Sequence, residues 1–90
     1  MSSYLLTVAT PDGNCFKGDV VFLSLRGTEG DLAIMAGHAP FVTAVLPCTL
    51  HLETEAGEDL YGKTEGGLLA VSPEGVSLLL GSYEPVEHDS

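Results

Sequence analysis

Positively charged residues are scarce in this 90-residue sequence: Lys17, Arg26 and Lys63 stand against 13 Asp and Glu residues, giving a formal net charge of −10 at pH 7. Nucleic acids and anionic lipid surfaces are bound through clustered Lys and Arg side chains. The sequence therefore argues against nucleic acid or an anionic membrane surface as a direct partner. A basic protein surface is a better match for so acidic a chain.

Long apolar runs are also missing. Runs such as Val20–Leu23 and Leu78–Leu80 fall far short of the ~18 residues that a membrane span needs. The N-terminus lacks the basic and apolar regions of a secretory signal, so we expect a cytoplasmic chain with reduced cysteines. Cys15 and Cys48 lack the paired spacing of a zinc site, and we expect both to be small buried residues.

Helical periodicity is absent from every window of ten or more residues, whereas a period of two is clear. In the segment from Leu46 to Glu53 the even positions are apolar, which places Leu46, Cys48, Leu50 and Leu52 on a core face. His51 and the other odd positions then face water, and Pro47 lies at an edge or at the strand's start. Val76–Leu80 repeats the pattern.

Turn residues separate short apolar segments at regular intervals, which is typical of an antiparallel sandwich or barrel. The strands that this pattern predicts lie near Tyr4–Thr10, Phe16–Arg26, Leu46–Glu53, Leu60–Lys63, Leu68–Ser72 and Val76–Leu80. The chain is therefore predicted to be all-β, with one domain over residues 1–83. The acidic tail, residues 84–90, is predicted to be disordered.

Catalytic patterns are poor. The pair Gly66-Gly67 lacks the Lys-Ser/Thr of a phosphate loop, and the three histidines, His38, His51 and His88, occur singly. His51 followed by Glu53 is only a fragment of a metal-binding barrel's pattern. The paired carboxylates, Glu53/Glu55 and Glu58/Asp59, are interpreted as solvated charges at a hairpin turn.

One loop, Met35–Phe41, is apolar apart from His38, although its Gly and Pro residues prevent a regular strand. Such a loop either folds back over the core or meets a partner.

The order of several motifs resembles the epsilon subunit of F-type ATP synthase over residues 4–83. The motifs are Thr7-Val8-Ala9-Thr10-Pro11-Asp12-Gly13, Phe16-Lys17-Gly18-Asp19-Val20, Thr28-Glu29-Gly30-Asp31-Leu32-Ala33-Ile34, Gly37-His38-Ala39-Pro40-Phe41 and Glu65-Gly66-Gly67-Leu68-Leu69-Ala70-Val71, followed by Val76-Ser77-Leu78-Leu79. Each motif is weak alone, but together they keep the family's order and spacing.

The resemblance implies a flattened antiparallel β-sandwich of about ten short strands and a non-catalytic role in the rotor. The family's sandwich binds the gamma subunit along one sheet and meets the membrane c-ring with loops at one end, coupling proton translocation to ATP synthesis. By resemblance, Glu29, Gly30 and Asp31 contact the c-ring. Thr10, His38 and Thr43 occupy positions that face gamma.

The resemblance also implies no catalytic residues, no cofactor or metal and no small-molecule substrate of its own. It places the chain at the cytoplasmic face of the plasma membrane, attached only through the complex. Asp31 stands where the family commonly has Glu, Glu65 replaces a Ser, and Ala70 replaces a Glu. The family's C-terminal helical hairpin has no counterpart in this sequence, so its autoinhibition and ATP binding are not expected here.

Two other hypotheses remain open at this point. One is an independent acidic β-sandwich that binds a different basic protein. The other is a small metal-dependent barrel enzyme that uses His51 and Glu53.

Overall fold

The computed structural model describes residues 2–87, and in that range all regular structure is β-strand. The strands are β1 (Tyr4–Thr10), β2 (Gly13–Gly27), β3 (Gly30–Ile34), β4 (Phe41–Val45), β5 (Cys48–Thr54), β6 (Asp59–Thr64), β7 (Gly67–Ser72), β8 (Gly75–Leu80) and β9 (Glu84–Val86). Residues 2–87 contain no helix of the length and hydropathy that a membrane span needs.

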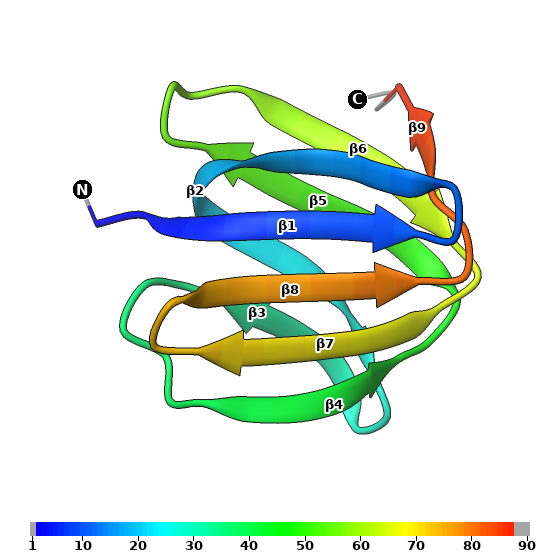
Figure 1. The fold of residues 1–90 in the computed structure, drawn as a ribbon, viewed down its shortest axis with the longest axis horizontal. Helices are drawn as coiled ribbons and strands as arrows, with labels where there is room; N and C mark the ends of the chain where they lie inside the picture. The colour runs from blue at the N-terminus through cyan, green and yellow to red at the C-terminus, as the bar shows by residue number, and fades with distance from the viewer. Residues whose placement is uncertain (1, 88–90) are drawn as a thin grey trace.

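The strands form two layers that face each other across one core. The first layer contains β4, β7, β8, β1 and the first half of β2, and the second contains β3, the second half of β2, β5, β6 and β9. Figure 1 shows β1, β8, β7, β4 and the first half of β2 in front, with the second half of β2, β3 and β5 passing behind them. The prediction of an all-β sandwich is confirmed.

Strand β2 belongs to both layers and joins them. Its first half pairs with β1 up to Val20, and its second half pairs with β3 from Leu23 to Gly27. The register with β5 shifts between Val20 and Phe22. A bulge bends a strand and increases its twist, which allows these 15 residues to cross from one layer to the other.

The core is made of aliphatic side chains from both layers. Their alternation along each strand places every second residue between the layers. The buried set is Leu6, Val8, Val20, Leu23, Leu25, Ile34, Val45, Leu50, Leu52, Leu69, Val71, Val76, Leu78 and Leu80. Leu50, Leu52, Val76, Leu78 and Leu80 are core residues, as the period of two predicts.

Tyr4 links the two layers with a polar contact. Its hydroxyl donates a 2.7 Å hydrogen bond to the backbone carbonyl of Ile34, at the end of β3. Burial disfavours the phenolate and raises the pKa of Tyr4 to about 12. The hydroxyl therefore stays protonated and able to donate throughout the physiological pH range.

The predicted strand boundary at Leu46 is wrong. Strand β5 begins at Cys48, and Leu46 and Pro47 form the exposed connection from β4. The backbone N–H of Leu46 donates to the carbonyl of Arg26, so this residue fastens the β4–β5 connection to β2 and its side chain is not a core residue. Cys48 packs against the core, but Cys15 is exposed, so its predicted burial is also wrong.

The predicted disorder after residue 83 is wrong for Glu84–Val86. These residues form β9 and pair antiparallel with β6, with Pro85 opposite Gly62. Because Pro lacks a backbone N–H donor, it is tolerated only at an edge, which is where β9 lies. Residues 88–90 of the predicted tail lie outside the described residues.

Residues 2–87 form nine strands where the resemblance implies about ten, and among them the pair β1–β8 is parallel. The Cα atoms extend over 28 × 28 × 26 Å, so the sandwich is nearly as deep as it is wide.

Candidate functional site

The outer surface of the first layer has an unusual composition for an acidic protein. Because neighbouring residues of a strand point to opposite faces, the residues that alternate with the core of β1, β8, β7 and β4 point outward. They are Leu5, Thr7, Ala9, Ser77, Leu79, Leu68, Ala70, Val42 and Ala44, which we call the apolar face. None of these side chains is charged.

The largest side chains of the apolar face are open to solvent. Val42 is 69% exposed, Leu79 57% and Leu68 50%. Leu68 and Leu79 are direct cross-strand partners, and Ala44 continues the row on β4. The solvent-facing side of a sheet is ordinarily polar, so an exposed apolar one is a candidate interaction surface.

Charges begin at the margin of the apolar face. On the first half of β2, Lys17 lies opposite Thr7 and Asp19 lies opposite Leu5. An apolar centre bordered by charge is the usual anatomy of a protein interface.

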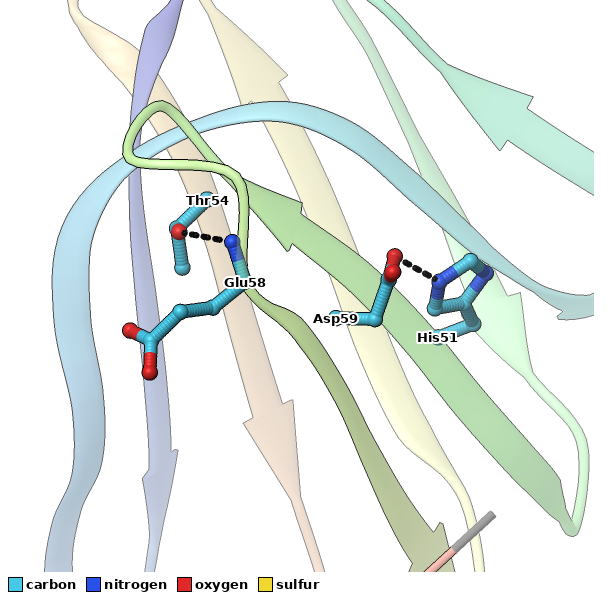
Figure 2. A network of polar contacts seen from close by, with 4 residues as sticks. All are labelled: His51, Thr54, Glu58 and Asp59. Atoms are coloured by element: carbon cyan, nitrogen blue, oxygen red, sulfur yellow. Dashed lines mark hydrogen bonds and ion pairs between the residues drawn. The ribbon is translucent and has the colours of Figure 1, made fainter. Parts of the chain in front are cut away.

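The outer face of the second layer is polar. His51 on β5 contacts Asp59 on β6, with 2.9 Å between Nε2 and Oδ1 (Figure 2). The His51 ring also stacks on Tyr61, with ring centroids 4.5 Å apart. These cross-strand contacts stabilise the sheet, as such pairs usually do.

The metal-enzyme hypothesis gains no support from this geometry. His51 is engaged by Asp59 and Tyr61, and Glu58 belongs to the turn, where its backbone N–H donates to the Thr54 hydroxyl at 3.0 Å (Figure 2). Within residues 2–87, no three His, Cys, Asp or Glu side chains are grouped closely enough to hold a metal ion.

The second candidate region is the hairpin that joins β2 to β3. Thr28 and Glu29 form its turn, and Gly30 follows the turn. The φ of Gly30 is +118°, a backbone conformation that residues other than glycine rarely adopt. Just behind the turn, Arg26 and Asp31 lie opposite each other, with 3.2 Å between Nε and Oδ1. The hairpin therefore presents two carboxylates, of which one has a cation beside it.

A groove of about 410 Å³ connects this hairpin to β4. It is lined by residues 27–32 on one side and 41–43 on the other. Glu29, Gly30 and Asp31, predicted to contact the c-ring, and Thr43, predicted to contact gamma, thus line one groove. The groove also reaches Val42, so the hairpin and the apolar face are continuous.

Thr10 and His38 lie outside this groove, near opposite ends of β1. Thr10 is the last residue of β1, whereas His38 lies in the β3–β4 loop, which approaches the beginning of β1 (Figure 1). The two ends of β1 are about 20 Å apart, at roughly 3.3 Å per residue. The His38 ring lies 5.1 Å from that of Phe41, and its Nδ1 lies 3.3 Å from the carbonyl of Ala39, so the loop partly holds its own histidine.

The apolar face was missed by the sequence analysis, although a signal for it is present. Leu68-Leu69 and Leu78-Leu79-Leu80 are apolar at odd and even positions alike. A strand with one solvated face ordinarily alternates, so these unbroken runs indicate strands that are apolar on both faces.

Comparison with known proteins agrees with this fold. Residues 3–86 match the family described as ATP synthase, Delta/Epsilon chain, beta-sandwich domain. The chain is similar to one in the cryo-EM structure of the Euglena gracilis mitochondrial ATP synthase, OSCP/F1/c-ring in rotational state 1. The identity is 25% and the TM-score 0.86, over 94% of this chain and 54% of that one.

A second similar structure is the central stalk/c-ring of the Tetrahymena thermophila mitochondrial ATP synthase, with a TM-score of 0.71 over 91% of this chain. At 16% identity, that likeness concerns the fold alone. This chain spans 54% and 66% of the lengths of the two solved chains. The match over residues 3–86 shows that the chain belongs to the ATP synthase Delta/Epsilon chain beta-sandwich domain family.

Proposed function

We propose that this chain is a non-catalytic central-stalk subunit of a rotary ATP synthase, which links the gamma subunit to the membrane c-ring. The observation that carries the proposal is the apolar face, nine outward side chains without a charge in a chain of net charge −10. Soluble monomers rarely expose an apolar patch of this kind, and such patches mark interaction sites. The solved relatives supply the context, since one belongs to an OSCP/F1/c-ring assembly and the other to a central stalk/c-ring assembly.

Gamma is the partner that we assign to the apolar face. Thr10 directly follows Ala9 of that face, and the loop of His38 leads into β4, which carries Val42. Both residues would then contact gamma at the margins of the face. Thr43 alternates with Val42 and Ala44 and therefore lies on the opposite face of β4, so it would have to contact gamma through the groove.

The c-ring contact is assigned to the β2–β3 hairpin, through Glu29, Gly30 and Asp31. Carboxylates at an exposed turn would complement basic loops on the ring, and such complementarity serves orientation more than affinity. The chain would lie on the cytoplasmic side of the membrane and be held there through the complex. It would transmit rotation without carrying out any chemical step itself, so it would need no cofactor or metal.

The proposal is tested by placing a charge on the apolar face. Leu68→Asp should lower the affinity for purified gamma by at least about tenfold, because the carboxylate would be buried unpaired in the interface. Thr49→Asp is the matched control, since Thr49 is exposed on the outer face of the second layer. Equal thermal stability of the two variants would show that the fold is intact.

If Leu68→Asp bound gamma as tightly as wild type does, the apolar face would not be the binding surface for gamma. Failure of the wild-type chain to bind gamma at all would favour the alternative, an independent acidic sandwich with another partner.

A further inference from the structure

Arg26 occupies a place in the β2–β3 hairpin that the family resemblance does not explain. It lies directly opposite Asp31 in the β2–β3 register, and its Nε is 3.2 Å from Oδ1 of that residue. Both side chains are exposed, 58% for Arg26 and 82% for Asp31. A cation therefore stands beside one of the two carboxylates that we assign to the c-ring contact.

The other carboxylate of the hairpin is uncompensated. Glu29 lies in the turn itself, and within residues 2–87 it has no hydrogen bond or ion pair. Its side chain is exposed and is free to meet a cation of a partner. The two carboxylates thus differ in availability, although the sequence presents them as one acidic motif.

An approaching basic group must either take Asp31 from Arg26 or leave that pair in place. Exposed ion pairs are weak, so the exchange is possible, but the partner gains less from Asp31 than from a free carboxylate. Arg26 also repels the incoming cation, because its own charge stays at the contact.

We infer that Arg26 is a specificity-determining residue of the c-ring contact: it occupies Asp31 as an internal partner and leaves Glu29 as the principal carboxylate for a basic loop. This inference rests on the proposed function and deepens it. Arg26 restrains the affinity of the hairpin for basic surfaces, so the contact depends on geometry at Glu29 more than on total negative charge.

The test compares Arg26→Gln with Lys63→Gln. Lys63 lies on the same outer face, with β5 between it and β2, and each substitution removes one positive charge from the chain. Binding to a purified gamma–c-ring subcomplex in detergent is measured at low and high ionic strength. We expect Arg26→Gln to tighten binding about twofold to fivefold at low ionic strength, while Lys63→Gln stays close to wild type. High salt should erase the difference.

Carboxylate variants complete the test. In the wild-type background Glu29→Gln should weaken binding more than Asp31→Asn, and Asp31→Asn should have a larger effect once Arg26 is replaced. If Arg26→Gln bound more weakly than wild type, Arg26 would itself be a contact and the inference would be overturned. If Arg26→Gln and Lys63→Gln had equal effects, the net charge of the chain would explain both, and the inference would likewise be overturned. Either result leaves the proposed function standing, whereas a wild-type chain that does not bind the subcomplex would overturn the proposed function.

Discussion

At the scale of single residues, Tyr4 shows how one polar group fixes the relation of two layers. Most of the contact between the layers is aliphatic and has no preferred direction. The bond from the Tyr4 hydroxyl to the Ile34 carbonyl has a direction, and it lies where β3 leads into the loop that carries His38. The bond thereby ties the end of β3 to the beginning of β1.

Tyr4→Phe should lower the free energy of unfolding by about 1 kcal/mol at neutral pH, because the Ile34 carbonyl loses its donor. The pH dependence gives a second readout. The folded-state pKa is raised to about 12 from an unfolded value of 10.0, so this contribution is fully present below about pH 10 and is lost as the pH rises through about 12.

Urea unfolding at neutral and at alkaline pH measures both effects. The variant should lose less stability than wild type on going to alkaline pH. Some loss should remain, because burial, followed by the charge of Cys15, also raises the pKa of Tyr83. An identical alkaline decline in the two proteins would mean that Tyr4 is not the group responsible.

Gly66 and Gly67 are a second case in which single residues decide the packing. Gly66 has a φ of +112°, and a Cβ added there would collide with the carbonyl of Val45. A Cβ on Gly67 would collide with the backbone carbonyl of Leu79. The sequence shows the pair as a motif, but its cause is that the backbones of β4 and β8 lie close to these two glycines on either side, which no local pattern reveals.

Gly67→Ala should therefore destabilise the protein by about 1–3 kcal/mol, since backbone must move to admit the methyl group. Gly18→Ala is the matched control: Gly18 is also in a strand, and its added Cβ would lie 3.4 Å from the Phe16 ring, an ordinary contact. Chemical denaturation of both variants measures the difference. Equal stabilities would contradict the close approach at Gly67.

At the scale of elements, the alternation of polar and apolar residues predicts a strand well only where one face is exposed to solvent and the other is buried. It located β5 and β8 to within a few residues, whereas β1, β2, β6 and β7 were located by the turn residues that separate apolar segments. Strands β3 and β4 have five residues each and follow a turn and a Pro, so too few positions remain to show a period. The acidic β9 is a strand only because β6 offers it an edge.

The candidate site also has a part that the sequence predicted and a part that it did not. The family motif located the hairpin of Glu29, Gly30 and Asp31, because that motif is continuous in sequence. The apolar face could not be assembled from the sequence, because it needs the order of β1, β8, β7 and β4, in which β1 and β4 come from the first half of the chain. Arg26 beside Asp31 likewise requires the β2–β3 register.

At the scale of the whole molecule, the charge of −10 is unevenly placed. The apolar face has no charged side chain, while the second layer and the turns carry most of the carboxylates. Net charge predicted a basic partner, and it could not show that the molecule also has a neutral, apolar side. Two surfaces of different chemistry, joined by the groove beside β4, suit a subunit that lies between two different partners.

The most direct test of this central claim is thiol labelling of the two outer faces with and without gamma. In a Cys15→Ser background, which removes the exposed native thiol, Ser77→Cys reports on the apolar face and Thr49→Cys on the opposite face. Gamma should slow labelling at position 77 strongly and leave labelling at position 49 unchanged. Protection at position 49 alone, or equal rates at both positions with gamma bound, would contradict the assignment of gamma to the apolar face.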